Sequence, residues 1–310
     1  MLNRDNFTGP WAGLPVAWTD ADEFDEERYR QCVIACCDAG VPGVYTGGTT
    51  GEFYAMEWDE FCAVAKATVD ECHSRNVPAM IGCTATYTRG VLKRVRFASD
   101  IGADAVQIAL PFWMEIEDPD VVPFFSQIEN ELNGMVLSVY ETLRAKKALT
   151  IDQHRGIKGA VPNYLMVKSN DGTLGHSPQG CEQLSEFVNV FTGESTWNSL
   201  GPHGVRGGCS SMIYWNPKVT LRFWTAVSNR DWTTVAEQHE KIGALFDFVV
   251  SNFAPKGYTD TAFDRLGGLA SGFLPTSHHS RAPYRSTTEQ DVAELRQWYE
   301  SNFPEMLWAD

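Results

Sequence analysis

Short apolar runs alternate with amphipathic helical patterns along the first two-thirds of this chain, and this alternation limits the fold more than any other feature of the sequence. Several runs are apolar at nearly every position, which is typical of strands buried on both faces of a parallel sheet. In all, eight strands are predicted, at residues 13–19, 43–46, 79–83, 105–110, 135–140, 164–168, 190–193 and 207–211. Eight strands, each followed by a helix or a long loop, predict an α/β fold of the (β/α)8 TIM-barrel type rather than an open sheet.

The pattern changes at about Pro217, beyond which only helical periodicities remain, at residues 217–228, 231–253, 259–269 and 287–303. A single (β/α)8 barrel typically needs ~250 residues, so 310 residues are enough for a barrel and an extension. We therefore expect residues 1–216 to form a barrel that carries the active site. Residues 217–310 are expected to form a C-terminal helical region.

Charge and hydropathy exclude several kinds of partner. Forty acidic residues against 25 lysines and arginines give a net charge of -15, which repels the phosphates of a nucleic acid. No apolar run reaches the ~18 residues that a bilayer requires, and the first ten residues lack the apolar stretch of a secretion signal. The eight cysteines lie mostly within apolar patterns, which favours reduced thiols. We expect a cytoplasmic protein with no nucleic-acid partner and no membrane partner.

The sequence predicts neither a metal site nor a bound cofactor. It contains no CxxC, HxH or HExxH pattern, and of its seven histidines only His278 and His279 are adjacent. Clustered histidine and carboxylate ligands are what a metal-dependent barrel isomerase or aldolase would need, so this class is disfavoured.

Two polar residues end apolar strand patterns. Lys168 closes the run that begins at Tyr164, and Tyr140 closes the run that begins at Met135. In a (β/α)8 barrel the active site lies at the C-terminal ends of the strands. There a desolvated lysine amine can form a Schiff base, and a phenol can transfer protons. Taken singly, either residue also fits a strand end whose polar tip simply reaches water.

A glycine-rich loop, GGTTGE at residues 47–52, directly follows the second predicted strand. Successive backbone N–H groups in such a turn, together with two hydroxyls, can hold a carboxylate or a phosphate. The glycines are equally expected in an ordinary turn that needs positive φ angles. The loop is neither a Walker A motif nor a GxGxxG motif.

Together these features resemble the dihydrodipicolinate synthase / N-acetylneuraminate lyase family of Schiff-base (class I) aldolases. The resemblance rests on the GTTGE segment after the second strand, on Tyr140 ending the fifth strand and on Lys168 ending the sixth, 28 residues later. A glycine-rich segment at residues 204–210 and the C-terminal helices extend the resemblance over nearly the whole chain. It implies a (β/α)8 fold without a cofactor, and a homo-oligomer, either a dimer or a tetramer.

The resemblance also implies a role for each site residue. Lys168 would form a Schiff base with the keto carbon of pyruvate or another 2-oxo acid, and Tyr140 would carry protons to and from the reacting groups. Thr50 would orient that tyrosine. The list of expected carboxylate-binding and site-lining residues is Gly48, Thr49, Thr50, Gly208 and Cys209.

This sequence departs from the family where the second substrate would bind. The synthases carry an arginine shortly after the tyrosine, but Ala145 occupies that position here, and Arg144 or Lys146 is the expected substitute for binding substrate. Phe112 and Trp113 stand where the synthases have two tyrosines, and neither ring can relay a proton. Glu141 is expected to add an acid near the mouth of the barrel.

The leading hypothesis is a Schiff-base lyase that acts on pyruvate or a related 2-oxo acid by aldol cleavage, condensation or dehydration. A 2-oxo-3-deoxy sugar acid is one candidate substrate. Two alternatives remain open: a true dihydrodipicolinate synthase, which condenses pyruvate with aspartate semialdehyde, and a catalytically silent member of the family that binds 2-oxo acids.

Overall fold

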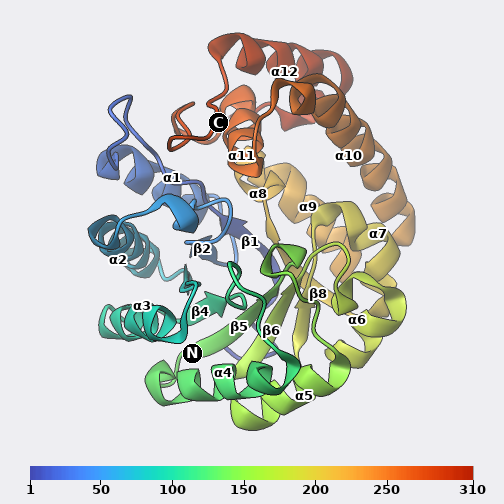
Figure 1. The fold of residues 1–310 in the computed structure, drawn as a ribbon. Helices are drawn as coiled ribbons and strands as arrows, with labels where there is room; N and C mark the ends of the chain where they lie inside the picture. The colour runs from blue at the N-terminus through green and yellow to red at the C-terminus, as the bar shows by residue number, and fades with distance from the viewer. Residues whose placement is uncertain (310) are drawn as a thin grey trace. The chain divides into compact units, whose positions relative to one another are not determined.

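Eight parallel strands form a closed barrel in the order β1 to β8 in the computed structural model, which describes residues 1–309. This confirms the predicted (β/α)8 class (Figure 1). The strands are β1 Gly9–Gly13, β2 Val44–Thr46, β3 Ala79–Gly82, β4 Ala105–Ile108, β5 Val136–Glu141, β6 Tyr164–Ser169, β7 Asn189–Phe191 and β8 Val205–Ser210.

Each strand is followed by at least one helix, and four further helices form the C-terminal region that the sequence predicts. The helices between and directly after the strands are α1 Glu26–Asp38, α2 Trp58–Ser74, α3 Thr88–Asp100, α4 Asp118–Leu132, α5 Ile151–Ala160, α6 Pro178–Ser185, α7 Trp197–Leu200 and α8 Met212–Trp215. The C-terminal helices are α9 Pro217–Ser228, α10 Trp232–Phe253, α11 Asp260–Ser271 and α12 Glu289–Asn302.

Local sequence signals explain where the C-terminal helices begin. The Asn216 side chain accepts a hydrogen bond from the Val219 N–H at 3.3 Å, and Pro217 occupies the first helical position of α9. At α12 the Thr288 and Asp291 side chains form a reciprocal capping box. Thr288 is therefore the N-cap of α12.

The first strand lies earlier than the predicted residues 13–19. β1 covers Gly9–Gly13 and pairs with β2 through Ala12 and Gly13. The Leu14 N–H still donates to the Tyr45 carbonyl at 2.9 Å, but Pro15 has no N–H with which to continue the ladder. The apolar residues after Gly13 are buried as a loop, so hydrophobicity alone placed the strand too late.

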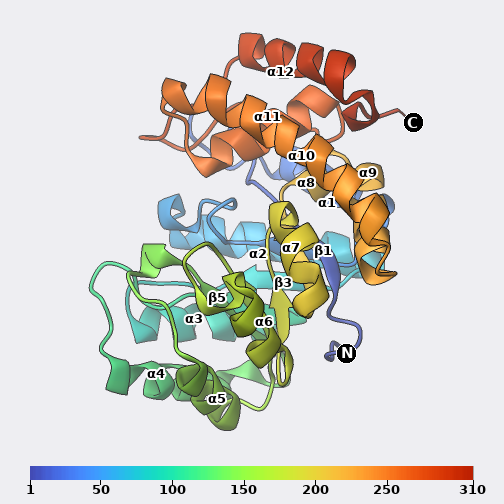
Figure 2. The same ribbon diagram turned by 90° about the vertical axis from the view of Figure 1, so that its right-hand side faces the viewer.

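Two compact units make up the chain. One comprises Met1–Gly9 and Pro78–Cys209, and the other comprises Pro10–Val77 and Ser210–Asp310. In the first unit, the strands from β3 to β8 are hydrogen-bonded in sequence order, and α4 packs against α3 and α5. In the second unit, α11 packs against α8 and α12, as Figure 2 shows. The predicted division after residue 216 stays a prediction.

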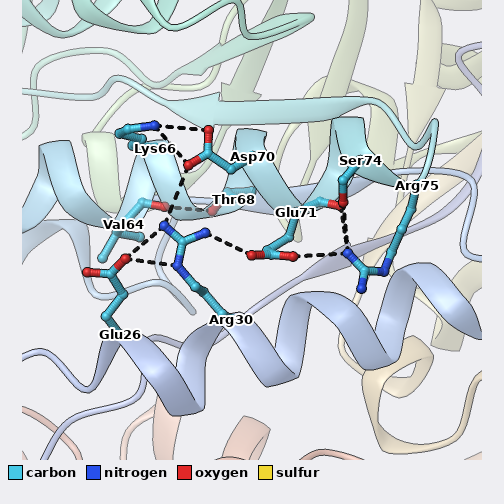
Figure 3. A network of polar contacts seen from close by, with 9 residues as sticks. All are labelled: Glu26, Arg30, Val64, Lys66, Thr68, Asp70, Glu71, Ser74 and Arg75. Carbon is cyan, nitrogen blue, oxygen red and sulfur yellow. Dashed lines mark hydrogen bonds and ion pairs between the residues drawn. The ribbon is translucent and has the colours of Figure 1, made fainter.

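A polar network joins α1 to α2 within the second unit (Figure 3). The Arg30 guanidinium of α1 bonds to Glu26 of its own helix and to Glu71 of α2, both at 2.8 Å, and lies 3.5 Å from Asp70. Glu71 also bonds to Arg75 at 2.9 Å. These partly exposed ion pairs contribute little stability individually, so their main effect is to fix how the two helices align.

Three structural observations concern membrane-spanning helices, metal ligands and cysteines. Within residues 1–309 no helix is both long and apolar enough to cross a bilayer. Over the same residues no three His, Cys, Asp or Glu side chains gather as metal ligands would. All eight cysteines are free thiols.

Candidate active site

Lys168 and Tyr140 lie side by side at the ends of two neighbouring strands of the first unit. They are register partners in the parallel pair of β5 and β6, so their side chains leave the sheet on the same face. The Lys168 amine lies 4.2 Å from the centre of the Tyr140 ring. The two groups that the sequence singled out are therefore within reach of one small molecule.

Asn170 fixes the Tyr140 hydroxyl and is a site residue that the sequence analysis missed. Its side-chain amide donates to the phenol oxygen at 3.3 Å, and its own N–H donates to the Glu141 carbonyl at 3.2 Å. The phenol oxygen accepts one hydrogen bond from the amide, and a phenol O–H can also donate one to an acceptor. Asn170 lies two residues after Lys168, in the segment where the sequence departs from its family.

Cys209 of β8 shares the interior of the first unit with Lys168. Its thiol lies 3.7 Å from the side-chain amide of Gln107, which also donates to Ser138 at 3.2 Å. Burial raises the pKa of the Cys209 thiol, while the Lys168 charge and the Gln107 amide partly oppose this rise. Cys209 is therefore a neutral thiol near the amine at neutral pH, which fits a residue that lines a site.

Gly208 contributes only backbone to this region. A Cβ at this position would lie 2.4 Å from the Thr192 carbonyl and 3.1 Å from the Trp197 ring, so no larger residue fits. The direction of that clash is toward Trp197, whereas the next residue, Cys209, faces Gln107. Alternation along β8 explains why the two neighbours face opposite ways.

Glu141 does not place an acid at the barrel mouth, so that expectation is wrong. Its carboxylate is buried, accepts the Leu149 N–H at 2.8 Å and lies 3.3 Å from Nε2 of His154 in α5. The physical reason is strand alternation: Tyr140 faces one side of β5, and the next residue must face the other. His154 in turn bonds to the Tyr164 hydroxyl at 2.8 Å, completing a buried polar set behind the strands.

Arg144 is exposed on the short 3-10 helix η2 (Leu143–Ala145), which follows β5. Ala145, at the position of the family's arginine, is buried. The role of Arg144 in substrate binding therefore stays a prediction.

Large apolar side chains are exposed where β3, β4 and β5 end. We call this set the apolar rim; its members, with their exposed fractions, are Tyr87 (60%), Trp113 (75%), Met114 (74%) and Leu143 (53%). The Lys146 amine donates to the Trp113 carbonyl and so ties the loop after β5 to the loop after β4. An exposed apolar rim at the C-terminal ends of these strands suits a substrate with an apolar end.

The glycine-rich loop lies in the second unit, and its glycines are required by the turn itself. A Cβ on Gly48 would lie 1.8 Å from the Tyr45 hydroxyl, and one on Gly51 would lie 2.6 Å from the Gly47 nitrogen. Gly47 has a φ of 72°, in the left-handed region. The glycines alone therefore do not demonstrate an anion site, and Thr49 and Thr50 remain the chemically informative residues.

Glu52, the last residue of the loop, is an internal anchor. It is fully buried in a left-handed conformation with a φ of 51°, and its carboxylate pairs with the fully buried Arg265 of α11. The Trp18 indole donates to the same carboxylate at 2.6 Å, and the Arg281 N–H at 3.0 Å. The Arg265 guanidinium also donates to the Val16 carbonyl at 2.6 Å. The C-terminal region thus holds the loop that follows β2.

Thr50 lies beside a buried carboxyl group, that of Asp264 in α11. Burial raises the pKa of Asp264 to about 7, against the opposing effect of the neighbouring Thr50 and Tyr214 hydroxyls. The sequence analysis missed Asp264, because helical periodicity says nothing of a contact between residues so far apart in the chain.

Comparison with known proteins adds independent information. A family model described as the dihydrodipicolinate synthetase family matches residues 6–301. A 4-hydroxy-tetrahydrodipicolinate synthase of Bradyrhizobium diazoefficiens is 25% identical over 291 residues, which are 92% of this chain and 97% of that protein. A trans-O-hydroxybenzylidenepyruvate hydratase-aldolase of Pseudomonas aeruginosa is 28% identical over 153 residues, 47% of this chain and 46% of that one.

Solved structures share the fold at lower identity. PhdJ bound to a substrate intermediate superposes with a TM-score of 0.84 at 22% identity, covering 97% of this chain and 98% of that one. YagE of E. coli K12 in complex with pyruvate superposes with a TM-score of 0.85 at 19% identity, covering 95% of this chain and 98% of that one. Both similarities extend over the barrel and the C-terminal helices together.

Proposed function

The chain belongs to the dihydrodipicolinate synthetase family of lyases, and from this premise we propose that Lys168 forms a Schiff base with pyruvate or a related 2-oxo acid. The observation that carries the proposal is the pairing of the Lys168 amine with the Tyr140 ring at the ends of β5 and β6. In this proposal Gly48, Thr49 and Thr50 bind the substrate carboxylate, and Thr50 orients Tyr140.

We further propose that the substrate is an aryl-substituted or otherwise apolar 2-oxo acid, cleaved to pyruvate and an aldehyde. Two observations support this class over a sugar acid. The apolar rim offers contact area to a ring and few hydrogen-bonding groups to a polyol. A hydratase-aldolase that is named for an arylidene pyruvate is among the relatives.

The residues of the site can carry this reaction in balanced steps. The Lys168 amine attacks the keto carbon, and loss of water gives a protonated imine. Water adds across the C3–C4 double bond of the substrate, giving a 4-hydroxyl. Tyr140 becomes a phenolate when it gives its proton to the carbinolamine hydroxyl that departs as water. The phenolate then removes the proton of the 4-hydroxyl, the C3–C4 bond breaks, and its electron pair passes into the imine as an enamine, after which Tyr140 can return the proton to C3. The aldehyde leaves, C3 gains a proton, and water releases pyruvate from Lys168.

The substrate class is tested by comparing three reactions of the unaltered protein. With trans-benzylidenepyruvate we expect benzaldehyde and pyruvate, the latter detected with lactate dehydrogenase. A 2-oxo-3-deoxy sugar acid should react with a lower kcat/KM. A higher value for the sugar acid would contradict the apolar substrate class but leave the Schiff-base chemistry in place.

Condensation of pyruvate with aspartate semialdehyde should be negligible. That reaction needs a positive group for the second carboxylate, and Ala145 offers none where the family has its arginine. It also needs a proton route, to which Phe112 and Trp113 contribute no hydroxyl. A coupled assay that gave a kcat/KM in the usual range of ~10⁴–10⁸ M⁻¹s⁻¹ would show this interpretation to be wrong.

Replacement of Tyr140 by phenylalanine should lower turnover by at least ~100-fold, the low end for losing a positioned acid–base group. Pyruvate binding should change far less, because the ring that faces Lys168 is retained. Tyr258→Phe is the matched control, since it removes a hydroxyl that bonds to Asp291 in the C-terminal region. Near-normal turnover in Tyr140→Phe would mean that Tyr140 only packs against Lys168.

A further inference from the structure

The segment that follows β6 holds the Asn170 side chain against the Tyr140 hydroxyl. The side-chain amide donates to the phenol oxygen at 3.3 Å. Tyr140 is buried and Asn170 is half-buried, so little water competes for this hydrogen bond. Both residues belong to the first unit, at the ends of the neighbouring strands β5 and β6. The contact is therefore part of the same strand-end arrangement as the Lys168–Tyr140 pair.

The backbone of Asn170 is held on both sides. Its N–H donates to the Glu141 carbonyl at 3.2 Å, directly beyond the last register pair of β5 and β6. Its carbonyl accepts the Thr173 N–H at 3.1 Å and the Thr173 hydroxyl at 2.6 Å. Gly172, within this turn, has a φ of 76°, and a Cβ there would lie 2.6 Å from the Leu143 side chain. A tight turn that is fastened at both ends therefore determines where the Asn170 side chain begins.

An amide donor is suited to this position because of the charge that Tyr140 carries during the proposed reaction. Once the phenol has given up its proton, a hydrogen bond to the charged oxygen contributes more than one between neutral groups. The asparagine amide donates without titrating and brings no charge of its own. The Lys168 nitrogen, 4.2 Å from the ring centre, is positive as an ammonium or a protonated imine and favours the phenolate as well.

The direction of this hydrogen bond decides its effect. An amide oxygen that accepted the phenol O–H would hold the proton on Tyr140 and oppose the phenolate. In the structure the Asn170 nitrogen is the atom that faces the phenol oxygen, so the bond favours the deprotonated tyrosine.

We propose that Asn170 is a positioning residue for the lyase reaction, whose amide N–H fixes the Tyr140 oxygen and stabilises it as a phenolate while the tyrosine transfers protons. This inference rests on the proposed function, because Asn170 acts only through the acid–base role of Tyr140. Asn170 does not contact the substrate in this scheme. Its loss should therefore slow proton transfer and leave pyruvate binding nearly unchanged.

The test measures proton transfer with pyruvate alone. In D2O the Tyr140 phenolate removes a proton from C3 of the pyruvate imine, and the electron pair of the C–H bond passes into the enamine. The phenol exchanges its proton with the solvent and returns a deuteron to C3, which proton NMR of the methyl group reports. Asn170→Ala should lower the saturated exchange rate by roughly 10- to 100-fold, the effect of losing a hydrogen bond to a charged group. The pyruvate concentration at half-saturation should change little.

Asn170→Asp keeps the size of the side chain but makes its hydrogen bonding depend on pH. An ionised carboxylate can only accept and repels the phenolate, whereas a protonated carboxyl can donate as the amide does. The exchange rate of Asn170→Asp, divided by that of the unaltered protein, should therefore be low at pH 8 and rise as the pH falls toward 5. The same ratio for Asn170→Ala should stay constant. A packing role would give the two variants parallel ratios, which would contradict the proposal.

Other titratable or charged groups near the pair are common to these variants, so the ratio removes their contribution. They are Lys168 on β6, Glu141 on β5, His154 on α5, Arg144 on η2, and Asp171 and His176 after β6. Asn133→Asp is the matched control, because the exposed Asn133 amide of the same unit also donates to a hydroxyl, that of Ser99, at 2.9 Å. Its ratio should stay near one at every pH.

A double-mutant cycle separates an effect through Tyr140 from any other. Once Tyr140→Phe has removed the hydroxyl, adding Asn170→Ala should have almost no further effect on the exchange rate. Additive effects would overturn the inference. So would an Asn170→Asp protein that exchanges at the normal rate at pH 8, because only an accepting amide oxygen could be replaced by a carboxylate.

Borohydride trapping of pyruvate distinguishes failure of this inference from failure of the proposed function. After long incubation the unaltered protein and both Asn170 variants should all give the adduct on Lys168, because each retains the amine. No adduct on the unaltered protein would overturn the Schiff-base proposal and this inference with it. A normal adduct together with additive mutational effects would overturn the role of Asn170 alone.

Discussion

Replacing Lys168 by alanine removes the pyruvate adduct that borohydride traps, and lowers turnover by at least roughly 10³-fold. The reason is that the imine nitrogen comes from this side chain, whose amine lies 4.2 Å from the centre of the Tyr140 ring. Intact-mass measurement should show the added mass on the unaltered protein only, and peptide mapping should place it on Lys168.

Lys158→Arg is the matched control for this experiment. Lys158 lies on α5, and burial lowers the pKa of its amine, so it is a competing nucleophile by the same physical argument. It donates, however, to the Pro162 carbonyl at 2.9 Å and the Tyr164 carbonyl at 2.8 Å. The control variant should therefore form the adduct normally. An adduct mapped to Lys158, or to any lysine other than Lys168, would refute the assignment.

Arg265→Met should lower the free energy of unfolding by about 3–5 kcal/mol, the usual cost of removing one partner from a buried ion pair. The substitution keeps a side chain of similar length but leaves the Glu52 carboxylate buried without its cation. Urea unfolding at neutral pH measures the loss. Adding Glu52→Gln should recover part of the lost unfolding free energy, because the unpaired buried charge of the Glu52 carboxylate is then removed as well.

Arg30→Met provides the comparison on the surface. Arg30 forms more ion pairs than Arg265, with Glu26, Asp70 and Glu71, but they are partly exposed in the network between α1 and α2, so the expected loss is at most about 1 kcal/mol. An equal loss of unfolding free energy in the two variants would contradict the argument that a buried ion pair contributes more stability than partly exposed ones. Arg265→Met should also weaken pyruvate binding, which Arg30→Met should not.

The sequence was sufficient for the fold class and for the residues that stand at strand ends. Eight apolar runs with helices between them leave few topologies, and Lys168 and Tyr140 are conspicuous because each interrupts an apolar pattern at its end. Continuous apolarity was a poorer guide at β1, where Pro15 ends the ladder and the following apolar residues are buried without extending the barrel strand.

Other parts of the site depend on contacts that no local pattern encodes. Asp264 and Arg265 lie on a helix whose period reveals only its buried face, more than 200 residues after the loop that they engage. Asn170 is one polar residue in a polar segment, and only its distance to the Tyr140 hydroxyl distinguishes it. Glu141 is different, because strand alternation was available in the sequence and would have turned it away from Tyr140.

The engagement of the glycine-rich loop by α11 has a consequence for how the protein matures on the ribosome. When residue 210 has been synthesised, all eight strands exist, together with Lys168 and Tyr140. Asp264 and Arg265 are still missing, so Glu52 has no guanidinium partner and Thr50 no carboxylate. A nascent chain at that stage contains the reactive amine before the loop that is proposed to hold the 2-oxo acid has been organised. Under the proposed function, the 2-oxo acid would therefore be bound only after the last third of the polypeptide has emerged and α11 has packed.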